Sequence, residues 1–315
     1  MLEHYKAAML LSGVGDALGY RNQLWEFNDS GPEIQKLKKL GGLKKIKVEL
    51  PNWPVSDDTV LHLATAEGLA TGEVNRTLNP LLPPVSVCIL LILFKMRRRK
   101  YFIHTRYPKP DQLLSLVAVA VETSRMTHPH PTGFLGGVAS ALFASYAVQR
   151  RPITTWGLGL INEACPIAKS FVQSQGYAVE ETERDWSYFC DKWQWYLDLR
   201  GLSNGVGPVI WPSSYGPAER DEAYKSFSWS GWGGSSGHDA PMIALDALLG
   251  AGPDWEELMS RGAFHGGDSD STAVIACCCW GLLYGTKGVP ERNYSNLEFR
   301  DRLERSGEQL YALSH

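Results

Sequence analysis

Acidic side chains stand beside hydroxyl side chains in two short segments that lie far apart in this 315-residue chain. The first segment is Ser56-Asp57-Asp58-Thr59, and the second, residues 266–272, reads GGDSDST. Carboxylate and hydroxyl oxygens are the ligands that hard cations such as magnesium prefer. Asp268 and Asp270 are two positions apart, so on a turning backbone they could chelate one ion together. Each segment is therefore a candidate cation site.

Both segments also fit a purely structural role, because each precedes an apolar helical stretch. Ser and Asp at a helix start accept hydrogen bonds from free backbone N–H groups, and negative charge suits the positive end of the helix dipole. Taken singly, each segment is more often a helix cap than a metal site. Taken together they favour a cation site, since buried carboxylates need a cation or several hydrogen-bond donors.

Two further features could bind a ligand. Residues 228–239 read SWSGWGGSSGHD, and the N–H groups of such a glycine-rich loop can cradle a diphosphate while its aromatic rings stack on a base. A flexible surface loop is the more frequent role of this composition. Glu26 is a lone acid between Trp25 and Phe27, where a paired carboxylate at the surface edge is more common than a catalytic one.

The elements that position these residues are predicted to be helices. Apolar periodicity and end signals predict a helix opened by residues 56–59 and others at 4–12, 31–40, 112–126, 134–149, 156–174, 183–200, 239–251, 254–264, 272–285 and 296–313. Strand-like alternation is scarce, and residues 201–238 are expected to form long functional loops. The sequence thus predicts one all-α domain of about ten helices.

Composition narrows the class of protein. A net charge of −3, with 44% hydrophobic and 21% charged residues, is ordinary for a soluble globular protein and gives no attraction to nucleic acid. The six cysteines lack zinc spacing and are expected to be reduced thiols. The apolar run at 81–94 is broken by two prolines and is shorter than the roughly 20 residues of a membrane span. We therefore expect a cytoplasmic protein with no nucleic-acid or membrane partner.

Taken together, these segments resemble the ADP-ribosylglycohydrolase family. The resemblance covers roughly residues 1–70 and 111–315, and it looks closest to the ADP-ribosylarginine hydrolase branch of that family. The matching stretches, in the family's order, are AAMLLSGVGDALGY, WPVSDDTVLHLATAEGL, SRMTHPHPTGFLGGVASALF, SGWGGSSGHDAPMIALDALL and FHGGDSDSTAVIACCCWGLLYG.

The resemblance implies an all-α fold with a cleft that holds two magnesium ions, and it implies hydrolysis of the N-glycosidic bond between ADP-ribose and arginine in mono-ADP-ribosylated proteins. The implied metal ligands are Ser56, Asp57, Asp58, Asp268, Asp270 and Ser271. The implied ADP-ribose contacts are Trp229, Gly231, Gly233, Gly234, Ser235, Ser236 and Gly237, with Glu26 near the metals. Asp57 or Asp58 would act as general base.

Residues 71–110 depart from the family and are expected to form an atypical, disordered segment of the single domain at 1–315. The family is longer there and carries a glycine-rich segment and a Gly-Ala-Ala-Met-Arg helix that line the ADP-ribose cleft. The departure leaves alternatives open: an impaired form that binds ADP-ribose without turnover, a hydrolase of a serine-linked or O-acetyl ADP-ribosyl group, or a product without a stable fold.

Overall fold

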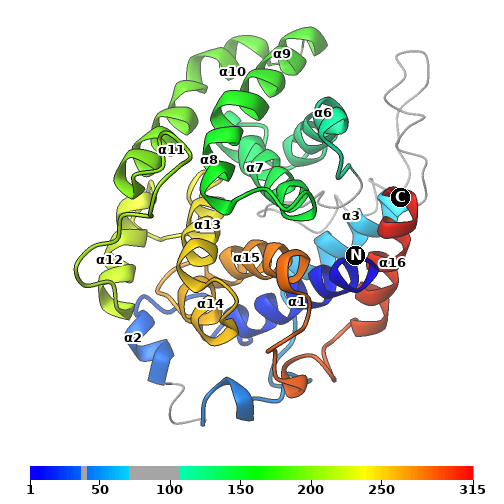
Figure 1. The fold of residues 1–315 in the computed structure, drawn as a ribbon, viewed down its shortest axis with the longest axis vertical. Helices are drawn as coiled ribbons and strands as arrows, with labels where there is room; N and C mark the ends of the chain where they lie inside the picture. Colours follow the sequence, from blue (N-terminus) through cyan, green and yellow to red (C-terminus); the bar gives the residue numbers. More distant parts are fainter. Residues whose placement is uncertain (37–40, 71–106, 177, 315) are drawn as a thin grey trace.

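The most apolar helices of the chain pack together at the centre of the molecule. The computed structural model describes residues 1–36, 41–70, 107–176 and 178–314, and Figure 1 shows their arrangement. The central helices are buried on nearly every side: α1 (Leu2–Tyr20), α7 (Pro131–Val148), α13 (Asp239–Ala251) and α15 (Ser269–Tyr284). Helices that are apolar all round are expected to form a core of this kind.

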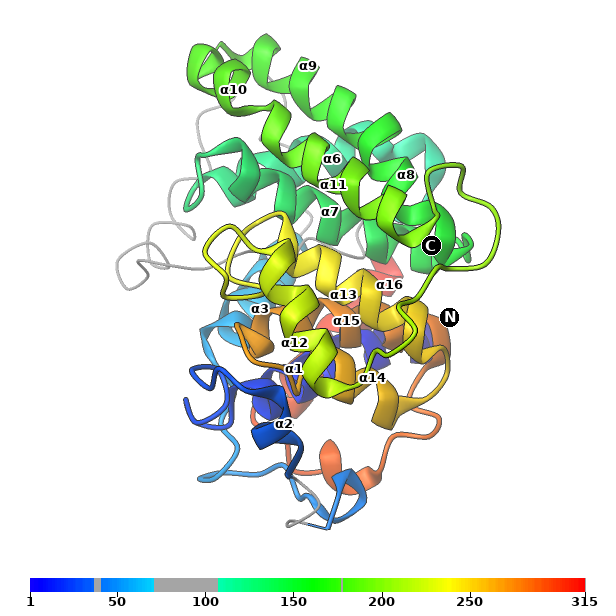
Figure 2. The same ribbon diagram turned by 90° about the vertical axis from the view of Figure 1, so that its left-hand side faces the viewer.

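Helices α1 and α15 run antiparallel and lie side by side in both ribbon views (Figures 1 and 2). They are so close that their backbones are in contact. Glycine allows this approach at both ends. A Cβ atom at Gly19 would lie 2.6 Å from the carbonyl oxygen of Ser269, and one at Gly281 would lie 2.8 Å from the backbone of Ala7. The start of α15, which carries the second acidic segment, is thereby fixed beside the end of α1.

The remaining helices surround this core in two groups. Those that cover the α7 side are α6 (Leu113–Arg125), α8 (Trp156–Gly159), α9 (Cys165–Gln175), α10 (Val179–Asp185) and α11 (Ser187–Arg200). Those that flank α1, α13 and α15 are α2 (Gly31–Ile34), α3 (Asp57–Ala70), α12 (Pro217–Phe227), α14 (Trp255–Gly262) and α16 (Arg300–Ser314).

Short helical turns connect several of these elements. They are the 3-10 turns Leu43–Lys45, Pro110–Gln112, Ile153–Thr155 and Glu291–Asn293, and the π turn Leu160–Ala164 between α8 and α9. Strand pairing in the described part of the chain amounts to one isolated parallel bridge between Gly233 and Gly267. The predicted all-α fold is confirmed.

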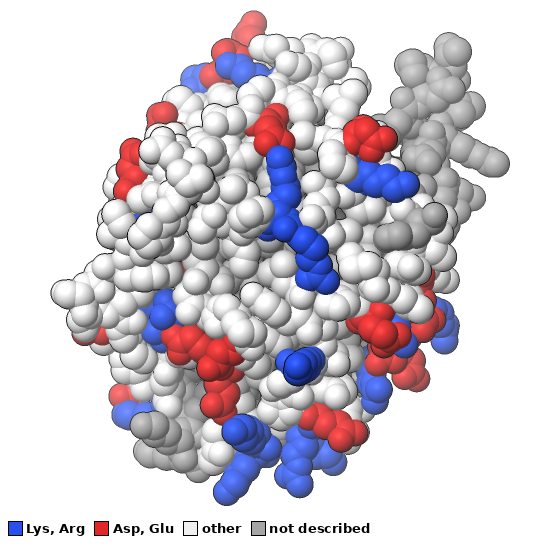
Figure 3. All heavy atoms as spheres, in the orientation of Figure 1, with Lys and Arg blue, Asp and Glu red and all other residues white. Residues whose placement is uncertain are grey.

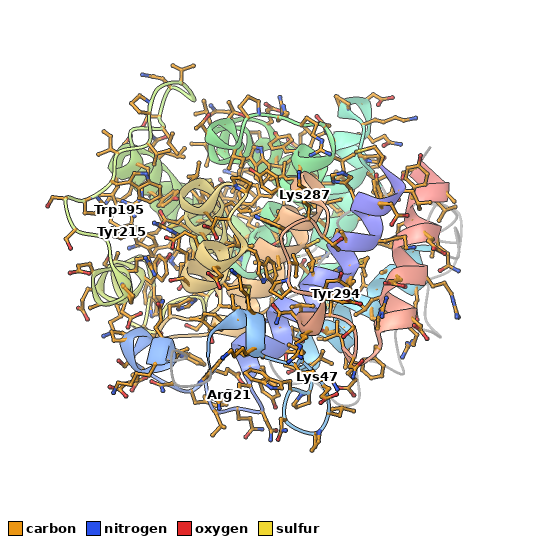
Figure 4. All side chains as sticks on the ribbon, turned by 60° about the horizontal axis from the view of Figure 1, so that its bottom comes forward. Arg21, Lys47, Trp195, Tyr215, Lys287 and Tyr294 are labelled. Carbon is orange, nitrogen blue, oxygen red and sulfur yellow. The ribbon has the colours of Figure 1, made fainter. Side chains whose placement is uncertain are left out.

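A buried ion pair fastens the long loop between α11 and α12 to the core. Nε of Arg200 lies 2.7 Å from Oδ1 of Asp246, and both residues are buried. The hydroxyl of Tyr215, a loop residue labelled in Figure 4, accepts from Arg200 at 2.6 Å and donates to Asp246 at 2.8 Å. These hydrogen bonds attach Tyr215 of the loop to α11 and α13, and each buried charge has a partner.

Several predicted boundaries were wrong. The helix predicted at 4–12 continues through three glycines to Tyr20, and residues 217–227, predicted as loop, form α12. The helix predicted at 183–200 is divided into α10 and α11. The atypical segment predicted at 71–110 lies outside the described residues except for 107–110.

The surface and one apolar helix bear on the class of protein. Helix α7 is long and apolar enough to cross a membrane, but 83% of its most apolar window is buried inside the protein, as in the core helix of a globular fold. On the face drawn in Figure 3, acidic and basic side chains are interspersed. This distribution agrees with the net charge of −3.

Candidate metal centre

The two acidic segments meet in space at the first turns of α3 and α15. The hydroxyl of Ser271 donates a hydrogen bond of 2.9 Å to Oδ2 of Asp58, across 213 positions of the sequence. Both residues are buried, as are Ser56, Asp268 and Asp270, whereas Asp57 is only partly buried. Of the six residues that the resemblance implied as metal ligands, the structure brings Asp58 and Ser271 into direct contact and places Asp268 and Asp270 next to them, with Ser56 accepting the Asp58 N–H group. Asp57 lies in the same first turn of α3 and remains a prediction as a ligand.

Asp16 of α1 holds the first segment in place. Its Oδ2 accepts hydrogen bonds from the N–H groups of Ser56 at 2.9 Å and Thr59 at 3.1 Å, and from the Thr59 hydroxyl. Burial raises the pKa of Asp16 to about 6. The carboxylate thus fixes the N-terminus of α3 from a neighbouring helix. The sequence signal for this residue is one acid in the apolar, glycine-containing second half of the helix.

Glu26 belongs to the densest group of carboxylates. One carboxylate oxygen from each of Glu26, Asp268 and Asp270 lies within 4.8 Å of the other two, and all three residues are buried. Burial, then the charges of Asp268 and Asp58, raise the pKa of Asp270 well above its usual range. Glu26 was expected only near the metals, and its position is that of a possible ligand.

The chemistry of this cluster fits a hard divalent cation. Oδ1 of Asp268 and Oδ1 of Asp16 are buried and accept no hydrogen bond from any described residue. Like charges so close together and so poorly hydrated are unfavourable unless a cation or protons compensate them. Carboxylate oxygens in this number are the ligand set of magnesium or calcium rather than of zinc or copper.

The glycine-rich loop lies against the second acidic segment. The N–H group of Asp268 donates to the carbonyl oxygen of Gly233 at 2.8 Å, and a Cβ atom at Gly267 would lie 2.3 Å from that oxygen. The glycine-rich loop is therefore attached through its backbone to the segment that carries Asp268 and Asp270.

Two amides of this loop are already engaged within the protein. Asp239, at the start of α13, accepts from the N–H groups of Gly234 at 3.0 Å and Ser236 at 2.8 Å. A diphosphate would have to bind other groups of the loop. Fewer backbone N–H groups are therefore available to it than the sequence suggested. Trp229 is 75% exposed, and its ring forms a T-shaped pair with that of Tyr188, with ring centroids 5.3 Å apart. Most of the Trp229 side chain is therefore accessible to a ligand.

A cavity of about 540 Å³ opens where these segments meet. This volume lies within the range of small-molecule binding sites. The rings of Phe27 and Trp232 stack at its wall, with centroids 6.0 Å apart and planes 20° apart. The described residues that line it are Phe27, Asp29, Lys225, Ser230, Gly231, Trp232 and Gly266. The cavity thus joins the residues after Glu26, the glycine-rich loop and the second acidic segment.

The fold and this site define an all-helical protein with a buried acidic centre beside a ligand-sized cavity. The chain belongs to the ADP-ribosylglycohydrolase family, whose model matches residues 1–86 and 102–315. It is 36% identical to "ADP-ribosylhydrolase ARH1" of Dictyostelium discoideum over 360 aligned positions, which cover 96% of this chain and 92% of that protein.

A second relative and one solved structure are also similar to this chain. The chain is 29% identical to "Putative ADP-ribosyl glycohydrolase L444" of Acanthamoeba polyphaga mimivirus, covering 93% of this chain and 66% of that protein. Its fold matches a solved structure titled "ADP-ribosylglycohydrolase-related protein complex" with a TM-score of 0.51 at 17% identity, over 100% of this chain and 99% of the other.

The comparisons also locate a difference from the family. The family model leaves out residues 87–101, which lie within the segment that departs from the family pattern. The 360 positions aligned with the Dictyostelium relative exceed the 315 residues of this chain, so that relative has stretches without a counterpart here.

Proposed function

We propose that this chain hydrolyses the N-glycosidic bond between ADP-ribose and arginine side chains of mono-ADP-ribosylated proteins. The observation that carries the proposal is the meeting of Asp58 and Ser271 beside the Glu26, Asp268 and Asp270 cluster, in a member of the ADP-ribosylglycohydrolase family. The name of the Dictyostelium relative, an ADP-ribosylhydrolase, supports the same reaction class.

The proposed cofactor is a pair of magnesium ions. The residues that would hold them are Ser56, Asp57, Asp58, Asp268, Asp270 and Ser271. Glu26 lies close enough to Asp268 and Asp270 to contribute a ligand oxygen. When bound, such ions would supply positive charge that orients the ribose hydroxyls and lowers the pKa of water. The support for metal is the number of buried carboxylates facing one another.

The carboxylates of the first segment are the proposed acid–base groups. Breaking the bond between C1 of the ribose and the guanidinium nitrogen builds positive charge on the ribose ring, which nearby carboxylates stabilise. Asp57 or Asp58 would take the proton of the attacking water. Asp58 is oriented by the Ser271 hydroxyl, whereas Asp57 is partly exposed and nearer to solvent.

The cavity and the glycine-rich loop are the proposed substrate site. Remote contacts to ADP-ribose would hold the reacting bond against the carboxylates and thereby lower the entropic part of the barrier. Trp229 offers an exposed ring face for stacking, and Ser230 and Gly231 line the cavity. The proposed contacts remain those of residues 229–237, with Gly234 and Ser236 acting as loop structure.

A second candidate function is ADP-ribose binding without turnover. The residues that the family model leaves out, 87–101, favour it, because the family pattern places part of the ADP-ribose cleft in this stretch. A third candidate keeps the hydrolase but changes the linkage to serine or O-acetyl. All three share the substrate group and differ in whether, and where, the bond is broken.

The decisive experiment is turnover by the purified chain. Peptides carrying arginine-linked or serine-linked ADP-ribose would be incubated with magnesium or with EDTA, and released ADP-ribose would be measured. We expect magnesium-dependent release from arginine only. Release from serine alone would select the altered linkage, and binding of ADP-ribose without release would select the silent form.

Two site variants and one control separate catalysis from folding. Asp57→Asn and Asp58→Asn should each lower turnover by roughly 100-fold or more, the scale of a lost general base or metal ligand. The control is Asp254→Asn, which alters an exposed cap of α14. Full turnover by both site variants would refute the assignment.

We also propose that the protein is cytoplasmic. All the described cysteines are free thiols: Cys165, Cys190, Cys277, Cys278 and Cys279. Free thiols suit a reducing compartment. Fractionation of cells that express the tagged chain would test this location.

A further inference from the structure

Asp221 is a buried carboxylate outside the acidic cluster, and both of its oxygens bind backbone. It lies on α12 and is 4% exposed. Oδ2 accepts the N–H group of Gly31 at 2.5 Å, and Oδ1 accepts the N–H group of Gly266 at 3.0 Å. One side chain therefore joins three parts of the chain that are separated by 190 and 45 positions.

Each of the two amides belongs to a segment that carries a carboxylate of the proposed metal centre. Gly31 begins α2, five positions after Glu26, and Gly266 precedes Asp268 by two positions. The two segments also touch directly, since a Cβ atom at Gly266 would lie 2.3 Å from the carbonyl oxygen of Asp29. Figure 2 shows α12 crossing beside α2, which brings Asp221 to this junction.

The same junction forms part of the cavity wall. Asp29 and Gly266 both line the cavity, and so does Lys225, one helical turn after Asp221 on α12. Asp221 is therefore placed to set the position of Glu26 relative to Asp268 and the shape of the adjoining wall at the same time. Both oxygens are engaged by backbone N–H groups, and Asp221 is not part of the carboxylate group of Glu26, Asp268 and Asp270.

We propose that Asp221 is a positioning residue that holds the Glu26 segment against the Gly266–Asp268 segment, so that their carboxylates form one cation site. The part of the proposal that concerns metal binding rests on the proposed function. The part that concerns structure, in which Asp221 accepts one N–H group from each segment, rests on the two hydrogen bonds alone. Removal of a residue that orients metal ligands without binding the metal typically lowers metal affinity 10- to 100-fold.

The test is the variant Asp221→Asn in the full-length protein. An amide of the same shape can accept only one of the two N–H groups and presents its own N–H₂ to the other. We expect the dissociation constant for Mn²⁺, measured by electron paramagnetic resonance, to rise about 10-fold. We also expect faster hydrogen exchange in residues 26–31 and 266–268, measured without metal.

Asp254→Asn is the matched control, because Asp254 also accepts a backbone N–H group, that of Glu257 at 3.1 Å, but at an exposed helix start. It should leave both readouts within twofold of the unaltered protein. If folded Asp221→Asn also retains Mn²⁺ affinity within twofold, or if both variants lower it equally, the positioning role is refuted.

A second variant covers the case in which Asp221→Asn does not fold. Gly266→Ala leaves Asp221 intact but forces a methyl group against residues 29 and 30. It should weaken Mn²⁺ binding in the same way, and unchanged affinity would refute the role. If the unaltered protein binds no Mn²⁺, the proposed metal function fails. The exchange rates of Gly31 and Gly266 then decide the positioning role, which unchanged rates would overturn.

Discussion

At the scale of single residues, the buried carboxylates fall into two kinds. Asp221 and Asp239 each accept a backbone N–H group through both oxygens, and Asp16 accepts two through Oδ2 alone. Asp268 and Asp270 instead face each other and Glu26. The hydrogen bonds of the first kind hold distant backbone segments together, whereas like charges of the second kind oppose folding. Such a local conflict is expected where function, rather than stability, has selected the residues.

This conflict predicts that Asp270→Asn will stabilise the metal-free protein. Asp270 is fully buried, and burial and the charges of Asp268 and Asp58 raise its pKa. The neutral amide removes that penalty and keeps an oxygen for the Ser271 N–H group. In EDTA, urea denaturation should show a gain on the order of 1–2 kcal/mol. A loss of stability in EDTA would show that the carboxylate is compensated within the protein.

Much of the site was visible in the sequence, and the reason is local. Two acids beside glycine and serine carry a recognisable pattern, so Ser56, Asp58, Asp268 and Asp270 could be selected before their distances were known. Asp16 and Asp221 could not, because their roles depend on amides supplied by residues 40 or more positions away. A lone acid in a helix gives no sign of such partners.

At the scale of elements, close packing overrides local preference. Gly13, Gly15 and Gly19 predicted an early end of the first helix, because glycine lowers helix stability by about 1 kcal/mol at each position. The helix continues because Gly15 and Gly19 lie against α15 and Gly13 lies against Leu303 of α16, where a larger residue would collide. Helix α12 was missed for another reason. Its eleven residues lie between segments rich in glycine, serine and proline, so the whole stretch 201–238 was predicted as loop.

Two glycines of the ligand loop should therefore respond differently to alanine. A Cβ atom at Gly237 would lie 1.8 Å from the carbonyl oxygen of Thr132, whereas one at Gly231 meets nothing within 4 Å. Gly231 has a φ of 78°, so Gly231→Ala should destabilise by only about 1 kcal/mol. Gly237→Ala should destabilise by about 3 kcal/mol, since the loop must move away from α7. Equal losses in thermal denaturation would contradict this account.

The contact between α1 and α3 predicts a pH effect on stability. Burial lowers the pKa of His62 to about 4, and its ring lies 3.1 Å from the Ser12 hydroxyl. Unfolded His62 takes up a proton near its ordinary pKa of about 6.5, so the unfolded state binds more protons between pH 6.5 and 4. Stability contributed at this site is therefore present above pH 6.5 and is lost as the pH falls toward 4, by about 3 kcal/mol in total.

The measurement is the difference between the unaltered protein and His62→Gln, because other groups titrate in the same range. The variant should show a shallower decline of the unfolding free energy between pH 6.5 and 4. Parallel curves for the two proteins would show that His62 can be protonated in the folded state without a loss of stability.

At the scale of the whole molecule, the candidate centre connects helices that are distant in sequence. The first acidic segment begins α3, the second begins α15, and Glu26 lies in the connection between α1 and α2. A cation bound among them would cross-link both ends of the chain in the folded state. The unfolded chain cannot reproduce this arrangement, so binding should appear as stability of the entire domain.

Magnesium should therefore raise the melting temperature of the full chain, and Asp268→Asn should abolish most of the rise. At a concentration 100 times the dissociation constant, binding to the folded state alone adds about 2.7 kcal/mol, which corresponds to several degrees for a domain of this size. Sodium chloride at equal ionic strength is the control, because screening of surface charge does not need Asp268. A rise of equal size in sodium chloride, or in Asp268→Asn, would mean that the stabilisation comes from general screening and not from a cation shared between α3 and α15.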